Sequence, residues 1–252
     1  MLNLNPHRDV SADLEAPRAS SWRNVRGGVK SEVDRVYDDI FDAVMDRRLL
    51  PGAKLTEATL CSVFACPRST VRTVLSQLAH DKIVVIEPNR GAFVWQPSAK
   101  ETRDVFEMRQ AMECMTIDML LALPDLAERL APLHDMVERE RKAFECGDRV
   151  SWIRLSNAFH VEMAHLLGNA VLTEMLHSLC ARTSLIIAHY DTPGESTCSY
   201  VEHLDILEQL AGNDAQGAKA AMRHHLEDCE HRMNQPEGAQ ASDPWLAFSV
   251  KR

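Results

Sequence analysis

Residues 51–94 read PGAKLTEATLCSVFACPRSTVRTVLSQLAHDKIVVIEPNRGAFV, and this stretch decides the fold of the first part of the chain. Thr56 is placed to cap a short helix that ends near residue 64. A second helix is expected from about 67 to 80, because apolar residues recur there at steps of three and four. Its buried side consists of Val71, Val74, Leu75 and Leu78. Two short helices joined by a tight turn are the geometry of a helix-turn-helix.

A β-hairpin is expected directly after these two helices. The β-prone runs IVVI at 83–86 and AFVW at 92–95 flank a polar tip, EPNRG at 87–91. Ahead of the two helices, apolar residues after Ser31 form one helical stripe, which ends at LLPG, 49–52. A helix, a helix-turn-helix and a hairpin in this order predict a winged helix-turn-helix.

The strand-forming pattern stops near residue 98, and the sequence up to about 234 is helix-forming with short breaks. The breaks lie near 123–124, 147–148, 168–169, 193–194 and 212–213. They delimit about six helices of roughly 16 to 23 residues, which predicts a helical bundle and a mainly α fold class. The expected division is a flexible N-terminal arm at 1–30, the winged helix-turn-helix domain at 31–97, a helical domain at 98–234 and a flexible tail at 235–252.

The charge of the chain is unevenly distributed. The formal net charge is −9, but residues 1–98 hold 13 basic and 12 acidic residues, against 15 and 25 in the remainder. A polyanion would therefore meet the N-terminal part. The seven cysteines form no CxxC pair, which argues against a disulfide framework or a thiolate zinc site. No apolar run approaches the roughly 20 residues needed to span a bilayer, so we expect a cytoplasmic protein without a membrane partner.

The ordered features of 51–94 resemble the DNA-binding half of the GntR family of bacterial regulators. The second half is similar to the branch that includes FadR and VanR, through FH at 159–160, EH at 202–203, GND at 212–214 and MRHHL at 222–226. The resemblance implies a ligand-responsive transcription regulator whose helical domain, called FCD, binds an effector. Two positions depart from the family pattern: Pro67 stands where Ser is usual, and Thr70 where Pro is frequent.

The second helix of the helix-turn-helix carries two arginines, Arg68 and Arg72, four residues apart on one helical face. An arginine fork can bond guanine O6 and N7 in the major groove of double-stranded DNA. On an isolated helix such a pair is more often a solvated face, but its position before a basic wing favours base contact. Further DNA contacts are expected from Ser69, Thr70 and Thr73 of the same helix and from Arg90 and Gly91 of the wing.

Three histidines on three different expected helices, His160, His203 and His225, could place their imidazoles in one cavity of the bundle. The family resemblance implies that these three bind a metal. Three imidazoles favour Zn²⁺, with Ni²⁺ or Mn²⁺ as alternatives. The resemblance also implies an Asp or Asn one turn before the first histidine, where this chain has Ser156. Serine is a poor neutral ligand, so such a site holds its metal weakly, completes it with water or effector, or has lost it.

Arg109 and Arg182 are candidates to bind the carboxylate of an effector in the same cavity, since guanidinium groups bind carboxylates bidentately. Arg109 could instead form a surface ion pair with Glu113, four residues on. The sequence thus predicts a homodimeric repressor that binds an inverted-repeat operator and senses a small organic acid with the help of a divalent metal. The alternative is a metal-dependent enzyme built on the histidine cluster, but the chain has no HExxH motif to support it.

Overall fold

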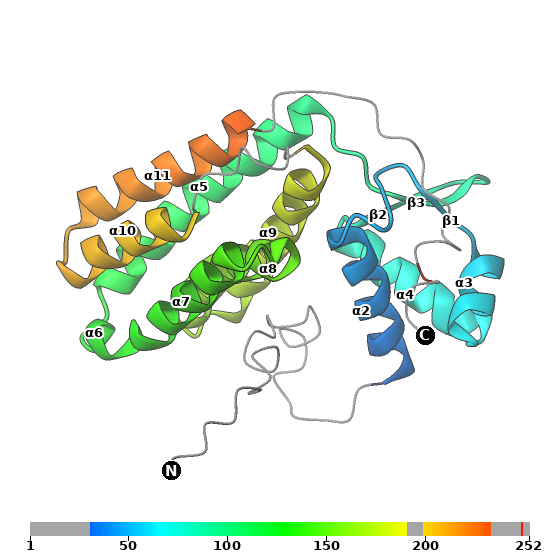
Figure 1. Cartoon of the computed structure of the whole chain (residues 1–252), viewed down its shortest axis with the longest axis horizontal. Coiled ribbons are helices and arrows are strands. Elements are labelled where there is room, and N and C mark those ends of the chain that lie inside the picture. The colour runs from blue at the N-terminus through cyan, green and yellow to red at the C-terminus, as the bar shows by residue number, and fades with distance from the viewer. Residues whose placement is uncertain (1–30, 191–198, 233–247, 249–252) are drawn as a thin grey trace, which may run out of the picture.

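The computed structural model describes residues 31–190, 199–232 and Phe248. The arm expected at 1–30, and the tail expected at 235–252 apart from Phe248, lie outside the described residues. The described chain forms two bodies in contact, a smaller one that contains the strands and a larger helical one (Figure 1).

The N-terminal body is a winged helix. Its elements are α2 (Glu32–Met45), β1 (Lys54–Leu55), α3 (Glu57–Phe64), α4 (Arg68–His80), β2 (Val84–Glu87) and β3 (Gly91–Val94). Strand β3 lies between β1 and β2 and is antiparallel to both, with Leu55 opposite Ala92 and Val85 opposite Phe93. The predicted helix, helix-turn-helix and hairpin are confirmed, and the short strand before α3 completes the sheet.

Caps account for where these helices begin. Ser31 accepts a hydrogen bond from the Asp34 amide, and the Asp34 carboxylate accepts one from the Ser31 amide, which forms a capping box. Thr56 caps α3 through the Thr59 amide. Pro67 occupies the N-cap of α4 and provides no side-chain hydrogen bond. Proline in place of the family's serine therefore removes a side-chain cap from α4, but the helix still forms.

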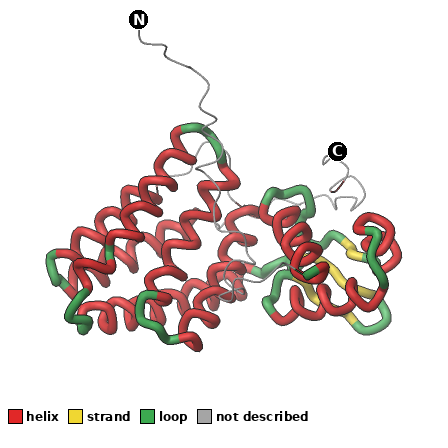
Figure 2. The backbone as a smooth tube through the Cα atoms, turned by 90° about the horizontal axis from the view of Figure 1, so that it is seen from below, coloured by secondary structure: helices red, strands yellow, loops and turns green. Residues whose placement is uncertain are grey.

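Within its described residues the C-terminal body consists of helices joined by loops (Figure 2). Its elements are α5 (Ala99–Leu121), α6 (Leu126–Arg129), α7 (Ala131–Glu145), α8 (Arg149–His165), α9 (Ala170–Tyr190), α10 (Ser199–Ala211) and α11 (Ala215–Arg232). The longer helices correspond to those predicted, whereas α6 is a single turn that the sequence pattern does not predict. The break expected near 193–194 lies in the part of the chain that is not described.

The helices of this body pack mainly in pairs. Helix α8 packs between α7 and α9, α5 packs against α9 and α11, and α10 packs against α7 and α11. Weaker contacts join α8 to α5 and to α10. The inward faces of α5, α7, α8, α10 and α11 consequently meet in one interior, which positions the site described below.

Helix α9 is long and apolar enough to cross a membrane by length and composition, over Ala170–Ile187 with a mean hydropathy of 1.2. This differs from the expectation that no apolar run approaches such a length. In the structure α9 packs against α8, α5 and α2, and 44% of that window is buried. Its packing in the bundle accounts for its apolar character.

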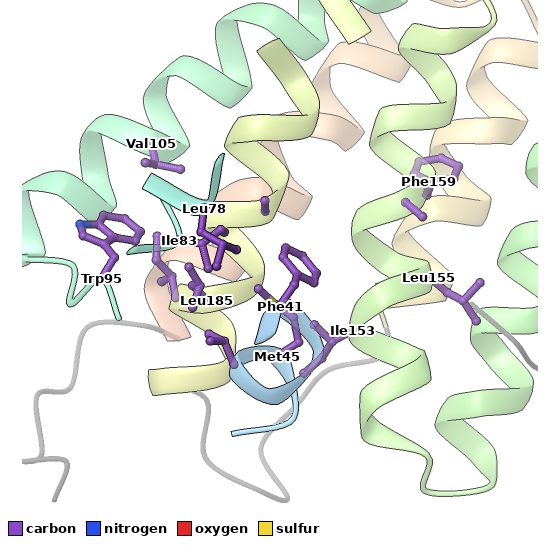
Figure 3. Packing of buried hydrophobic residues seen from close by; sticks show 14 of the residues in the cluster. Phe41, Met45, Leu78, Ile83, Trp95, Val105, Ile153, Leu155, Phe159 and Leu185 are labelled. Carbon is purple, nitrogen blue, oxygen red and sulfur yellow. The ribbon is translucent and has the colours of Figure 1, made fainter. Parts of the chain in front are cut away.

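An apolar junction joins the two bodies (Figure 3). Phe41 of α2 and Leu185 of α9 belong to one core cluster that continues from the winged helix into the bundle. An ionic clamp supplements it: Arg154 of α8 lies 2.8 Å from Asp42 and 3.2 Å from Asp46, both at the end of α2. The first helix of the winged helix is therefore fixed to α8 as well as to α9.

Candidate metal centre and nucleic-acid interface

The three histidines singled out in the sequence meet inside the bundle. His160 lies on α8, His203 on α10 and His225 on α11, and each residue is at most 2% exposed. One ring nitrogen of each lies within 4.8 Å of the others, and the Nε2 atoms of His160 and His225 are 3.2 Å apart. Three imidazole nitrogens this close together can bind one metal ion.

Nδ1 of each histidine forms a hydrogen bond with the carboxylate of a different glutamate. The pairs are His160 with Glu113 of α5 at 2.5 Å, His203 with Glu140 of α7 at 2.7 Å, and His225 with Glu202 of α10 at 2.5 Å. A carboxylate that accepts the Nδ1 proton leaves Nε2 with its lone pair and fixes the orientation of the ring. The three Nε2 atoms are therefore the atoms that could bind a metal ion.

The polar atoms that line this cavity fit a cation. Nε2 of His203 is buried and has no hydrogen-bond partner, which costs free energy unless a further group satisfies it. With the Nδ1 protons on the carboxylate side, the Nε2 lone pairs of His160 and His225 face each other at 3.2 Å. A metal ion bound by three imidazoles satisfies all three nitrogens.

The electrostatic surroundings of the cluster favour neutral imidazoles. Burial lowers the pKa of His160 well below its usual range, assisted by the charges of Arg109 and His203, so this imidazole is in the neutral form that binds metals. Burial raises the pKa of Glu113, while Arg109 opposes that shift through a hydrogen bond of 2.7 Å. The cluster thus lies among the three acidic side chains of Glu113, Glu140 and Glu202, with one guanidinium, that of Arg109, beside Glu113.

Ser156, one turn before His160, is buried, with 8% of its surface exposed. It occupies the position where the family resemblance implies Asp or Asn. The neighbouring Asn157 does not replace it, because its amide donates to the Ile153 carbonyl and it lines a separate small cavity beside α2. Within the described residues the group that could hold a metal ion consists of the three histidines. Further coordination positions are left to water or an external ligand.

The two arginines expected to bind an effector lie in different places. Arg109 is 1% exposed, so its pair with Glu113 is buried rather than at the surface. Its Nη2 atom is buried without a hydrogen-bond partner. Arg182 instead lines a cavity between the two bodies, together with Lys82 and Trp95. This differs from the expectation that Arg182 shares the histidine cavity, because its position on α9 directs it toward the winged helix.

The recognition helix α4 presents a polar face to solvent. Arg68, Ser69, Arg72 and Thr73 are all exposed. Nε of Arg72 donates to Glu57 of α3 at 2.8 Å, yet the Arg72 side chain remains 71% exposed. The Thr73 hydroxyl donates to the Ser69 carbonyl. Four of the five helix residues expected to contact DNA therefore share an accessible face.

Thr70 is the exception. It is 9% exposed, and its hydroxyl donates to Glu32 at the start of α2 at 3.0 Å. Two residues along a helix correspond to a rotation of roughly 200°, so Thr70 faces away from the side that carries Arg68. This corrects the expected DNA contact: Thr70 attaches α4 to α2.

The wing is the hairpin formed by β2 and β3. Arg90 pairs with Glu87 and lies over the ring of Phe93, 5.4 Å from its centroid, while its side chain remains 70% exposed. Gly91 has a φ of +104°, which residues with a Cβ rarely adopt. Arg72, Arg90 and Gly91 line one hollow of about 400 Å³ between α4 and the wing. The structure thus brings the wing residues beside the recognition helix.

Sequence reasoning missed the three glutamates as members of the site. From the sequence, Glu113 is expected only as a possible ion-pair partner of Arg109, and Glu140 is not expected at the site. The signal that would have found them is chemical, since a metal-binding histidine needs an acceptor for its other ring proton. Glu140 is 0% exposed, which is rare for a glutamate unless it is paired.

Comparison with known proteins follows the same division of the chain. Residues 32–94 match the family model "Bacterial regulatory proteins, gntR family", and residues 104–228 match the FCD domain. The HTH-type transcriptional repressor RspR of Escherichia coli (strain K12) is 23% identical over 200 residues, 79% of this chain and 86% of that protein. The HTH-type transcriptional regulator YdhC of Bacillus subtilis (strain 168) is 23% identical over 201 residues, 77% of this chain and 88% of that protein.

Solved structures show the same fold. A GntR transcriptional regulator from Rhodococcus sp. RHA1 is similar with a TM-score of 0.71 and 23% identity, over 81% of this chain and 98% of that one. E. coli McbR/YncC is similar with a TM-score of 0.67 and 21% identity, over 79% of this chain and 95% of that one. The matching families and relatives are regulators of transcription, which does not support the enzyme alternative. The chain therefore belongs to the GntR family of DNA-binding transcription regulators, with an FCD domain as its effector-binding half.

Proposed function

We propose that this regulator is a cytoplasmic repressor that binds an inverted-repeat operator as a homodimer and senses a small organic acid through a bound divalent metal. The observation that carries the proposal is a buried cluster of three histidines, each hydrogen-bonded to a glutamate. The three are His160, His203 and His225. Similarity to RspR, which is named a repressor, supports repression. We propose that residues 31–97 bind DNA and that residues 98–234 bind the effector and form the dimer.

Double-stranded DNA would be read by the exposed face of α4. Arg68 and Arg72 would enter the major groove and Arg90 the minor groove, with Ser69 and Thr73 near phosphates or base edges. Arg72 must leave Glu57 to reach a base, and a surface ion pair of this kind is worth at most about 1 kcal/mol. This contact is therefore a small barrier to DNA binding.

An exposed apolar face supports the homodimer. Met115 and Met119 of α5 are 47% and 36% exposed, and Val171 and Met175 of α9 are 68% and 51% exposed. The two helices pack against each other, and Met112 of α5 shares a small core with Leu172 and Leu176 of α9. Apolar patches on soluble proteins mark interfaces, and a two-fold operator calls for a self-complementary one. We propose that a second copy of the chain covers this face.

We expect the metal site to take a ligand, because three imidazoles leave coordination positions of the ion open. A site of three imidazoles that leaves coordination positions of the ion open suits Zn²⁺ best, and Ni²⁺ or Mn²⁺ are alternatives. When bound, the ion would supply a Lewis acid for an oxygen of the effector. Nη2 of Arg109, buried and without a hydrogen-bond partner, is the group that would meet a second carboxylate oxygen.

The test combines metal and DNA binding. A duplex is first selected from random sequences by the wild-type protein, and its affinity is measured by fluorescence anisotropy with and without zinc and a panel of small carboxylic acids. We expect a palindromic selected sequence, and at least one acid that weakens DNA binding in the wild type but not in His203→Ala. An acid that acts equally on both proteins would contradict the metal-assisted sensor. An asymmetric selected sequence would contradict the dimer.

A further inference from the structure

A second cavity lies between the winged helix and the bundle, separate from the histidine cluster. Its volume is about 340 Å³, within the range of small-molecule sites. Its walls come from both bodies: Lys82 and Val85 follow the recognition helix, Trp95 follows β3, Met108 lies on α5, and Leu179 and Arg182 lie on α9.

Two basic side chains face this cavity without ion pairs among the described residues. Nε of Arg182 is buried and has no hydrogen-bond partner. Burial lowers the pKa of Arg182, which indicates that nearby negative charge compensates only part of its desolvation. Lys82 is exposed in the turn that follows α4. The cavity therefore offers a half-buried guanidinium from the bundle and an ammonium from the winged helix.

The acidic residues of the same cavity are already engaged. Glu101 accepts hydrogen bonds from the Ser98 amide at 2.9 Å and the Ser98 hydroxyl at 2.7 Å, as part of the cap of α5. Asp104 forms an ion pair with Lys100 at 2.6 Å. The charge of Glu101 acts on Arg182, but neither carboxylate forms an ion pair with it among the described residues, so the buried Nε donor of Arg182 remains for an external anion.

The remaining walls of the cavity are apolar and partly exposed to solvent. Val85 is 39% exposed and Met108 is 49% exposed, although both are large hydrophobic side chains. Trp95 and Val105 form a buried surface beside them, at 7% and 5% exposure, and Figure 3 shows these two side chains at the junction of the bodies. A ligand that suits this cavity combines an apolar body with one negative charge.

We propose that this cavity is a second ligand site, which binds a small organic anion with an apolar body, such as a medium-chain carboxylate, with Arg182 as its anchor and Lys82 as a second contact. Lys82 is two residues beyond the end of α4, whereas Arg182 belongs to the bundle. A ligand held by both fixes the recognition helix relative to the bundle. The site therefore acts on the orientation of the DNA-binding surface without passing through the metal centre.

Isothermal titration calorimetry of the full chain with octanoate tests the site, with octanamide as the neutral analogue. Metal is removed with EDTA so that the histidine cluster cannot take the carboxylate. We expect one octanoate per protomer, at least tenfold weaker binding in Arg182→Gln, a smaller loss in Lys82→Gln, and unchanged binding in the matched control Arg103→Gln. Arg103 is exposed on α5 and does not line the cavity.

A second measurement locates the ligand. Octanoate should change the tryptophan fluorescence of the wild type, and Trp95→Phe should lose that change while calorimetry still detects binding. Equal affinity for octanoate and octanamide, or equal affinity of the wild type and Arg182→Gln, would overturn the proposal. Absence of octanoate binding to the metal-free wild type would overturn it as well.

Discussion

Replacement of His225 by alanine is the sharpest test of the proposed metal centre. The preceding residue, His224, provides a matched control. His225 is 2% exposed and lies 3.2 Å from His160, whereas the side chain of His224 is 72% exposed and its nearest acidic group is Asp228 at 3.4 Å. Both substitutions remove one imidazole from the same turn of α11. Only His225→Ala should affect the metal.

The expected magnitude follows from linkage between binding and folding. Zinc at about 1,000 times its Kd stabilises a protein that binds it only when folded by about 4 kcal/mol. For a chain of this size each kcal/mol raises Tm by about 2–4 °C, so zinc should raise the Tm of the wild type by about 10 °C. A hundredfold loss of affinity in His225→Ala removes about 2.7 kcal/mol of that stabilisation. About a third of the zinc-induced shift should then remain.

The assay is differential scanning fluorimetry of each protein with EDTA and with zinc, and the quantity compared is the zinc-induced shift within each variant. This comparison is needed because His225→Ala also leaves Glu202 and His160 with one partner fewer and lowers the stability of the metal-free protein. His224→Ala should keep the full shift. If both variants keep it, or both lose it equally, the assignment of the metal to the buried cluster is refuted.

Three further substitutions probe the two functional surfaces. Arg72→Ala should cost about 1–3 kcal/mol of binding to the selected duplex and less on random DNA, measured by anisotropy; an equal loss on both would assign Arg72 to phosphate contacts. Ser156→Asp should tighten zinc binding by adding a charged oxygen one turn from His160, and calorimetry that finds weaker or unchanged affinity would show that this position does not reach the metal. Glu140→Gln keeps the shape behind His203 but removes the charge, so zinc affinity should fall by about 10–100-fold; no change would mean that Glu140 is only structural.

The winged helix could be predicted from the sequence because its signals are local. Ser31 and Thr56 cap the helices they precede, and the runs 83–86 and 92–95 correspond to the two strands of the hairpin. The misplaced residue, Thr70, shows the limit of this reasoning. A short hydroxyl side chain on this helix is typical of a DNA contact, which is why Thr70 was expected to bind DNA. Its position around the helix axis instead directs the hydroxyl to Glu32, 38 residues earlier in the chain.

The histidine cluster could be predicted as a set, but its surroundings could not. Glu113, Glu140 and Glu202 come from three helices, and their distances to the rings depend on how those helices pack rather than on any spacing in the sequence. Arg182 was misplaced for the same reason. Helix α9 is long and contacts α2, α5 and α8, and composition does not tell which of these neighbours a given arginine meets.

Helix α8 connects the proposed metal centre to the DNA-binding body. It carries His160 in the cluster and, six residues earlier, Arg154 in the clamp on Asp42 and Asp46 of α2. About 9 Å of helix separates the two, and a helix transmits displacement over that length because its backbone hydrogen bonds make it stiff. A ligand changes the DNA-binding state only by the difference in its affinity for two arrangements of the bodies. We therefore expect an effector bound at the proposed metal site to alter the ion pairs of Arg154 when it shifts His160. By reciprocity, DNA that favours one position of α2 should then alter the affinity for the effector by the same factor.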